Sequence, residues 1–280
     1  QAEDGIRDRS PSRGLGDVYK RQRLRGIEES LIVEYILVTR CKKNMLALVF
    51  PGQGSQFVGM GKNLHDNFKI ARETFAQASD KLGIDMKQLC FENEDVHLTV
   101  NAQPAILTVS TAAHRVLSSE RDIKADFVVG HSLGEYSALV ASGSLDFEDA
   151  IWAVRKRGEY TQEAVPLGVG GMAAVLGLPD EQVNEICKEA SENNSHVAPA
   201  NYNSIGQVVI SGVKNAVEKA SELAKKAGAR RVVLLDISAP FHSELMQSAV
   251  EKMKVVLCLL YTSDAADDTP CVDLGGRRII

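Results

Sequence analysis

The stretch VVGHSLGEYSA, residues 128–138, decides the fold, because it places a serine between two glycines where an apolar run gives way to a helical pattern. Gly130, Ser132 and Gly134 fit G-x-S-x-G, with a strand expected before the serine and a helix after it. A sharp strand-to-helix turn crowds the backbone, so small residues are needed beside a serine whose hydroxyl stands exposed at the sheet edge. This context favours a nucleophile over the alternative, a tight turn with a capping serine.

Alternating apolar runs and helical patterns surround this motif. The β-rich run at 46–50 ends in the glycine-rich loop PGQGSQ, and helical patterns follow it. Such alternation predicts an α/β fold whose parallel sheet is covered by helices on both faces. The expected elements are strands at 46–50 and 125–130, and helices at 71–81, 104–117, 133–141 and 147–164.

After the glycine-rich segment at 168–171 the predicted order of elements changes to β-α-β-β-α-β. This is the order of a ferredoxin-like unit, which can be inserted into a larger domain. The chain from residue 236 onward is expected to return to the first part. This places SAPFHSELM, residues 238–246, at a junction between domains, where small-molecule sites tend to lie. The expected elements are strands at 172–176, 197–201, 207–211 and 230–235, and helices at 180–192 and 214–226.

Composition limits the possible partners. The chain has 280 residues, 44% of them hydrophobic, and a net charge of -5, which argues against a nucleic-acid partner. Its five cysteines lack metal-ligand spacing, and their odd number argues against a full disulfide framework, so we expect a reducing cytoplasm and no metal. No apolar stretch approaches the length of a membrane span.

The two ends differ in composition from the middle of the chain. Residues 1–22 and 261–280 are polar and lack apolar periodicity, so the ends, bounded at 1–44 and 258–280, are expected to be non-native or disordered tails, with Met45 as the natural start; native tails are the alternative. Between them we expect the first part of a large α/β subdomain at 45–168, a ferredoxin-like subdomain at 169–235 and a return to the large subdomain at 236–257.

A serine nucleophile needs a base and an oxyanion hole. The amide of Leu133, at the positive end of the following helix, is placed to stabilise an oxyanion, and the PGQGSQ loop can supply the amide of Gln53. Of six histidines, those at 65, 97, 114, 131 and 196 are expected on the surface, in packing, on a linker or facing away from the serine. His242 remains as the candidate base, with simple packing as the alternative.

Five motifs in series carry a family resemblance. They are VFPGQGSQFVGMG at 49–61, GHSLGEYSAL at 130–139, RKRGEYTQEAVP at 155–166, NYNSIGQVVISG at 201–212 and SAPFHSELM at 238–246. With these motifs in order, the chain from about Met45 to Leu257 resembles the malonyl-CoA:acyl carrier protein transacylase family. This resemblance implies an α/β-hydrolase-like core interrupted by a ferredoxin-like subdomain.

The resemblance also implies the roles of individual residues. Ser132 would accept the acyl group, His242 would act as its base, and the amides of Leu133 and Gln53 would form the oxyanion hole. Arg157 would bind the free malonyl carboxylate, a task suited to a planar guanidinium.

Two implied roles have weaker support in the residues themselves. Without the resemblance, the neighbouring basic residues Arg155 and Lys156 would favour a solvated helix face for Arg157. Phe241 would narrow the pocket against a branch at the second carbon of the substrate, an effect worth only ~1 to 3 kcal/mol.

The implied reaction is ping-pong malonyl transfer from malonyl-CoA to acyl carrier protein in fatty acid biosynthesis, by a protein that is monomeric at full length and needs no cofactor. The family carries a glutamine beyond Leu257 that helps orient the histidine; this chain lacks it, and uncovered sheet surface and low solubility or activity are expected. A G-x-S-x-G hydrolase, a fragment that only binds carrier protein or coenzyme A, and a domain of a larger synthase are the alternatives.

Overall fold

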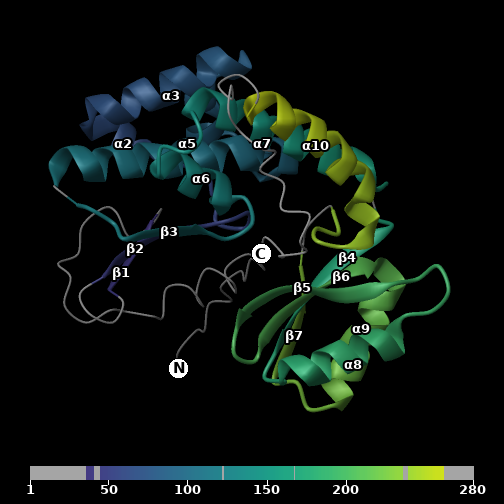
Figure 1. The fold of residues 1–280 in the computed structure, drawn as a ribbon. Helices are drawn as coiled ribbons and strands as arrows, with labels where there is room; N and C mark the ends of the chain where they lie inside the picture. Colours follow the sequence, from purple (N-terminus) through teal and green to yellow (C-terminus); the bar gives the residue numbers. More distant parts are fainter. Residues whose placement is uncertain (1–35, 41–44, 122, 167, 236–238, 262–280) are drawn as a thin grey trace, which may run out of the picture. The chain divides into compact units, whose positions relative to one another are not determined.

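The computed structural model describes residues 36–40, 45–121, 123–166, 168–235 and 239–261, so most of the two expected tails, residues 1–35 and 262–280, lies outside it. The chain forms two units, which we describe separately (Figure 1). The first unit comprises residues 1–97 and 105–147, and the second comprises residues 98–104 and 148–280. The helix expected at 147–164 therefore belongs to the second unit, although a boundary was expected at residue 168.

The first unit is built on a three-stranded sheet in the order β1-β2-β3. Strand β2 (Leu46–Phe50) pairs in parallel with β3 (Phe127–Gly130), as the alternating pattern predicts. Strand β1 (Leu37–Arg40) pairs antiparallel with β2, so ordered structure is present inside the segment 1–44 that was expected to be a tail.

Helices connect and cover these strands. Phe50 of β2 contacts His114, with ring centroids 6.2 Å apart, and His65 packs edge-on against Phe75 and Phe91 at 5.6 and 5.3 Å. His65 and His114 are thus packing residues, as expected. The helices are α2 (Lys62–Asn67), α3 (Lys69–Leu82), α4 (Met86–Glu92), η2 (Glu94–His97), α5 (Thr99–Glu120, of which 105–120 belong to this unit) and α6 (Gly134–Ala141).

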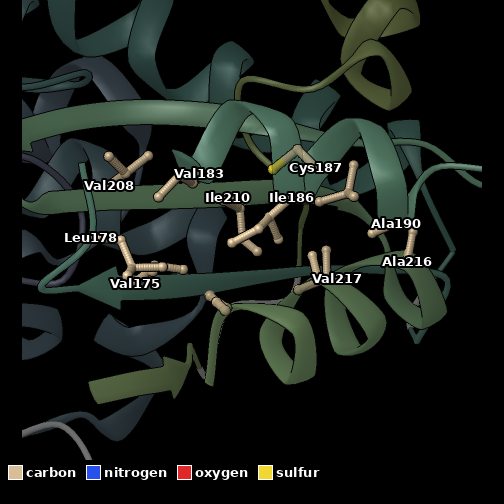
Figure 2. Packing of buried hydrophobic residues seen from close by; sticks show 14 residues of the cluster. Val175, Leu178, Val183, Ile186, Cys187, Ala190, Val208, Ile210, Ala216 and Val217 are labelled. Carbon is tan, nitrogen blue, oxygen red and sulfur yellow. The ribbon is translucent and has the colours of Figure 1, made fainter. Parts of the chain in front are cut away.

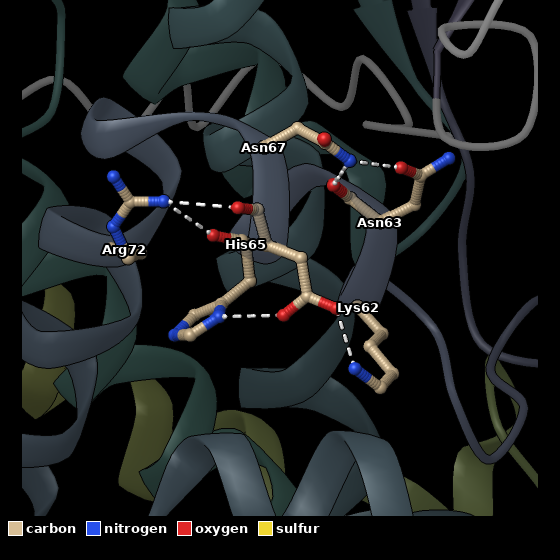
Figure 3. Close-up of polar contacts among 6 residues, drawn as sticks. Lys62, Asn63, His65, Asn67 and Arg72 are labelled. Atoms are coloured by element: carbon tan, nitrogen blue, oxygen red, sulfur yellow. Dashed lines mark hydrogen bonds and ion pairs between the residues drawn. The ribbon is translucent and has the colours of Figure 1, made fainter.

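The junction between α2 and α3 is held by side chains that bind backbone carbonyls (Figure 3). Arg72 Nη1 donates to the carbonyl oxygens of His65 and Asp66 at 3.0 and 3.2 Å, and Asn67 Nδ2 donates to the Asn63 carbonyl at 2.9 Å. The two bonds from Arg72 satisfy acceptors that the end of α2 leaves open. The hydrogen bond from Lys62 lowers the pKa of the Asp66 carboxyl.

The second unit contains a four-stranded antiparallel sheet in the order β5-β6-β4-β7. Its elements follow the expected order β-α-β-β-α-β. They are β4 (Gly170–Leu176), α8 (Asp180–Ala190), β5 (Val197–Ser204), β6 (Gln207–Val213), α9 (Lys214–Lys226) and β7 (Arg231–Leu234).

Alternate residues of the central strands face opposite sides of this sheet, as the two-residue period of a strand requires. Val175 and Ile210 pack against α8 and α9 (Figure 2). Met172, three residues before Val175, and Val209, one residue before Ile210, belong to a separate cluster that includes Phe241. One face of the sheet thus forms a core with its own helices, and the other receives the 239–246 segment.

Three further elements complete the second unit: α7 (Phe147–Ala164), η3 (Glu244–Met246) and α10 (Gln247–Tyr261). Lys252 of α10 bonds Glu163 of α7 at 2.8 Å and lies 5.1 Å from the centroid of the Tyr160 ring. Helix α10 continues past Leu257, because the apolar pattern VVLCLLY carries it to Tyr261.

Several large apolar side chains are exposed. Phe127 and Val129 on the edge strand β3 are 51% and 48% exposed, and Val255 and Leu259 on α10 are 62% and 60% exposed. A parallel strand normally has both faces covered, so β3 is an uncovered sheet surface of the kind expected. Among the helices of the described ranges, none combines the length and apolar character that a membrane span needs.

Candidate active site

Ser132 lies in a tight turn between β3 and α6, as G-x-S-x-G predicts. Its φ of 52° is left-handed, a conformation that costs a non-glycine residue free energy. Gly134, at the start of α6, comes so close to β2 that an added Cβ would lie 2.3 Å from the Phe50 carbonyl oxygen. The glycine is therefore needed for the helix to approach the strand, and the turn presents the serine in a strained geometry typical of a nucleophile elbow.

The glycine-rich loop after β2 abuts this turn. The amide of His131 donates to the Phe50 carbonyl at 3.0 Å, and a Cβ added to Gly52 would lie 2.4 Å from the His131 carbonyl oxygen. Within the loop, Ser55 Oγ donates to the Gly52 carbonyl at 2.8 Å. Gln53 is thus held in a short turn whose preceding residue touches the serine elbow.

The first amides of α6 distinguish Leu133 from its neighbours. The amides of Gly134, Glu135 and Tyr136 each donate to the carbonyl three residues earlier, at 2.9 to 3.2 Å. Leu133 precedes them as the N-cap residue, where the backbone N–H has no acceptor within the helix. This geometry suits Leu133 to donate to an oxyanion.

His242 lies in the second unit, on a turn that leads into η3. Its φ of 57° is also left-handed; among the described residues, only Ser132, Asn194 and His242 are non-glycine residues with positive φ. Ser243 Oγ donates to the Pro240 carbonyl at 2.7 Å, and Gly170 at the start of β4 comes so close that an added Cβ would lie 2.3 Å from Pro240 Cγ. The small sheet therefore fixes the turn that carries the histidine.

Phe241 is 8% exposed and packs with Met172, Ala174 and Val209 on one face of the small sheet. In this position the ring anchors the turn next to His242. The contacts of Phe241 thus show a packing role, and the role in the substrate pocket stays a prediction from the resemblance.

Arg157 lies on α7 and faces the first turn of α5, within the second unit. Its Nη1 donates to Gln103 Oε1 at 2.8 Å. The two helices meet closely here, because a Cβ added to Gly158 would lie 2.8 Å from Val100 Cα. Arg157 therefore has a defined, partly buried environment, which contradicts the alternative of a solvated helix face.

Helix α5 begins at Thr99, five residues before Pro104, where the helix was expected to start, and Arg155 helps to stabilise this earlier start. Pro104 lies inside α5 and has no N–H, so the Val100 carbonyl loses its helical donor. Arg155 Nη1 donates to that carbonyl at 3.2 Å and to Asn101 Oδ1 at 2.8 Å. Arg155 thus completes the helix turn that carries Gln103.

Glu159 forms ion pairs with basic residues of the same helix, α7. Partial burial acts to raise its pKa, but hydrogen bonds from Lys156 and then Arg155 prevail and lower the pKa below its ordinary value. Glu159 is therefore ionised at neutral pH and pairs with Arg155 and Lys156, at 3.2 and 2.7 Å.

The expected site residues fall into two groups. Ser132, Leu133 and Gln53 come together in the first unit, whereas Arg157, Phe241 and His242 belong to the second. Sequence reasoning missed Gln103, and the one available signal was a polar residue beside a proline in an otherwise apolar helix, NAQPAILTVS. The described part of the chain contains no cluster of three or more side chains suited to a metal ion.

Known proteins match the part of the chain that carries the five motifs. The family model for the acyl transferase domain matches residues 47–266, so the resemblance does not end near Leu257 but continues to residue 266. The malonyl CoA-acyl carrier protein transacylase of Bacillus subtilis (strain 168) is 49% identical over 229 residues, which are 81% of this chain and 71% of that protein.

Two solved structures are similar in fold as well as in sequence. The malonyl CoA-acyl carrier protein transacylase of Coxiella burnetii has a TM-score of 0.75 and 42% identity, over 76% of this chain and 68% of that one. A malonyl-transacylase in complex with a type II PKS acyl-carrier protein has a TM-score of 0.74 and 45% identity, over 76% of this chain and 70% of that one. Since the family model covers most of its length and its motifs fold as described, the chain belongs to the acyl transferase family.

Proposed function

We propose that the chain transfers a malonyl group from malonyl-CoA to the phosphopantetheine thiol of acyl carrier protein, in fatty acid biosynthesis. The observation that carries this proposal is the Ser132 elbow, with its left-handed φ of 52° and the glycine loop beside it. The relatives supply the substrate class, because their names specify malonyl-CoA and acyl carrier protein.

In the first half-reaction Ser132 Oγ attacks the thioester carbonyl of malonyl-CoA while His242 takes the hydroxyl proton. The amides of Leu133 and Gln53 stabilise the oxyanion of the tetrahedral intermediate. The carbon–sulfur bond then breaks, coenzyme A leaves with the proton from His242, and a malonyl ester remains on Ser132. The left-handed φ of both Ser132 and His242 supports this pairing, because strained backbone concentrates at active sites.

In the second half-reaction the carrier thiol gives its proton to His242 and attacks the ester carbonyl. The same two amides stabilise the second oxyanion, and the ester bond breaks as Ser132 regains its proton from His242. No cofactor enters either half-reaction, so the proposal includes none.

Arg157 binds the free carboxylate of the malonyl group. A guanidinium offers two parallel N–H donors to a carboxylate, whereas the methyl group of an acetyl chain accepts none. Gln103 holds Nη1 of Arg157 and thereby limits the orientations of the guanidinium plane. Phe241, which anchors the turn beside His242, narrows the site against branched acyl groups.

The finer fold assignment supports this site. We assign the first unit to an α/β-hydrolase-like core and the 170–234 segment to a ferredoxin-like subdomain, on the parallel β2/β3 pair and on the strand order β5-β6-β4-β7. A cytoplasmic location and a monomeric state at full length remain predictions.

The rival function is hydrolysis, since an esterase shares the serine elbow and the histidine. The test is to incubate the chain with malonyl-CoA in the presence and absence of phosphopantetheinylated acyl carrier protein, and to quantify malonyl-carrier and free malonate. Malonyl-carrier as the main product supports transfer; free malonate formed at the same rate without carrier supports a hydrolase. A chain that binds carrier protein or coenzyme A but yields neither product is a binding fragment.

A further inference from the structure

Ser211 carries a buried hydroxyl on the sheet face that receives the 239–246 segment. It lies on β6 and is 0% exposed, and its Oγ has no hydrogen-bond partner among the described residues. Ser211 pairs with Met172 of β4 and follows Val209 by two residues, so the three side chains share one face of the sheet. Its neighbours are therefore apolar, and an unpaired donor among them costs free energy.

The turn that carries His242 lies over these neighbours. Phe241, directly before His242, packs in one cluster with Met172 and Val209. These are the residues opposite and before Ser211 on the same face. The Ser211 hydroxyl is therefore placed beside the part of the turn that leads into the histidine.

One carbonyl of this turn also lacks a partner. The carbonyls of Ala239, Pro240 and Ser243 each accept a hydrogen bond, at 2.7 to 3.0 Å. The Phe241 carbonyl accepts none from the described residues, although Phe241 is only 8% exposed. An unpaired donor and an unpaired acceptor therefore belong to the same cluster.

The Phe241 carbonyl bears directly on the backbone of His242. It shares a rigid peptide plane with the His242 N–H, so the direction of this carbonyl is coupled to the φ of His242. That φ is 57°, in a region that a non-glycine residue keeps only when its surroundings hold it there. Serine has several staggered χ1 positions, so its hydroxyl can turn toward the carbonyl without a movement of β6.

We propose that Ser211 is a positioning residue for His242: its hydroxyl donates a hydrogen bond to the Phe241 carbonyl in the state in which His242 takes the proton of Ser132. This inference rests on the proposed function. The bond pairs two groups that the described state leaves unpaired, and it fixes the peptide plane next to the base. Ser211 makes no contact with the substrate in this role and acts only through the backbone of the turn.

The test uses variants that differ in this hydroxyl. Ser211→Ala removes it. Ser211→Thr and Ser211→Val have the same shape as each other and both suit a strand, but only threonine keeps the hydroxyl. Loading of Ser132 in the full chain is followed over time by intact-protein mass spectrometry at several concentrations of malonyl-CoA, with acetyl-CoA in parallel.

We expect Ser211→Ala to lower the maximal loading rate by roughly 3- to 10-fold, the usual effect of losing one neutral hydrogen bond. Malonyl and acetyl loading should slow equally, because the base serves both. The malonyl-CoA concentration that gives half the maximal rate should change by less than about 2-fold, since no substrate contact is lost. Ser211→Thr should load faster than Ser211→Val by a similar factor, roughly 3- to 10-fold.

Stability and a control separate this role from a purely structural one. The urea unfolding midpoint of Ser211→Ala should equal or exceed that of the parent chain, because an unpaired buried donor is removed. Thr111→Val is the matched control: Thr111 Oγ1 is also buried with no partner among the described residues, but it lies on α5 in the first unit. Its loading rate should equal that of the parent chain.

A folded Ser211→Ala chain that loads at the parent rate would overturn this inference. So would equal rates for the threonine and valine variants, or a loss of rate that follows a fall in the unfolding midpoint. The parent chain separates the two claims. Its failure to load malonyl on Ser132 would contradict the proposed function, whereas normal loading with no dependence on the hydroxyl contradicts only the role of Ser211.

Discussion

A Cβ atom added to Gly130 would lie 1.9 Å from the carbonyl carbon of Gly134, well inside any allowed contact. The obstacle is backbone on the other side of the serine turn, so no side-chain adjustment relieves it. The close approach of these two glycines is the physical reason for the spacing G-x-S-x-G in this chain. It forces the turn that places Ser132 between them.

Gly130→Ala should therefore destabilise the fold by at least about 3 kcal/mol, the upper end of the usual cost of overpacking. Gly171→Ala is the control, since its added Cβ would meet Lys214 at an ordinary 3.7 Å. Urea unfolding of both variants checks the prediction. Equal unfolding midpoints for the two would show that the turn is looser than described.

Arg155→Met should cost about 1 to 2 kcal/mol, because the Val100 carbonyl loses its donor. Pro104→Ala restores the missing helical N–H, so the same Arg155 substitution should cost less in that background. The other bonds of Arg155, to Asn101 and Glu159, are common to both backgrounds and cancel. A double-mutant cycle with a coupling energy near zero would contradict the assigned role of Arg155.

Arg157→Lys should lose most of the preference for malonyl over acetyl groups although it keeps the positive charge. A lysine ammonium cannot form the two parallel hydrogen bonds of a guanidinium, and it is too compact to hold the plane set by Gln103. The expected loss is about 10-fold or more in relative loading rate. Retained preference in Arg157→Ala would place carboxylate recognition elsewhere.

The cysteines should differ sharply in reactivity. Burial raises the pKa of the Cys90 thiol to about 12 and that of Cys187 to about 12, whereas Cys258 is exposed. At pH 8 the two buried thiols stay protonated and shielded, and the thiolate is the reactive form. Peptide mapping after iodoacetamide treatment should find Cys258 alkylated in the native state, and Cys90 and Cys187 only after unfolding. Native labelling of Cys90 at the rate of Cys258 would contradict the described core.

The helices and strands could be predicted where the apolar residues repeat with a single period along the sequence. Strand β2 at 46–50, helix α7 at 147–164 and helix α9 at 214–226 have the predicted bounds, because their apolar residues repeat at strand or helix spacing. Strand β5 extends to Ser204, although its end was expected at residue 201. The sequence pattern did not predict the longer strand, because irregularities at Pro199/Asn201 and Tyr202/Ser204 break the alternation of apolar and polar residues.

The rest depended on contacts between distant residues. Pro104 is a natural helix start by its own chemistry, but α5 begins at Thr99, and Arg155 on another helix donates to the Val100 carbonyl that Pro104 leaves without its helical donor. Strand β1 was missed because it lies before Met45, in the segment expected to be a tail, and it forms by pairing with β2. Among the site residues, the elbow followed from local spacing, whereas Gln103 is identified only by its bond to Arg157.

The most direct test of the account is intact-protein mass spectrometry after brief incubation with malonyl-CoA, alongside acetyl-CoA and a Ser132→Ala variant. Ser132→Gly serves as a second variant, because glycine tolerates the left-handed φ without strain. The account predicts a malonyl-sized mass increase that requires Ser132 and is weak with acetyl-CoA. No increase in a sample with a cooperative melting transition, or the same increase in both Ser132 variants, would contradict it.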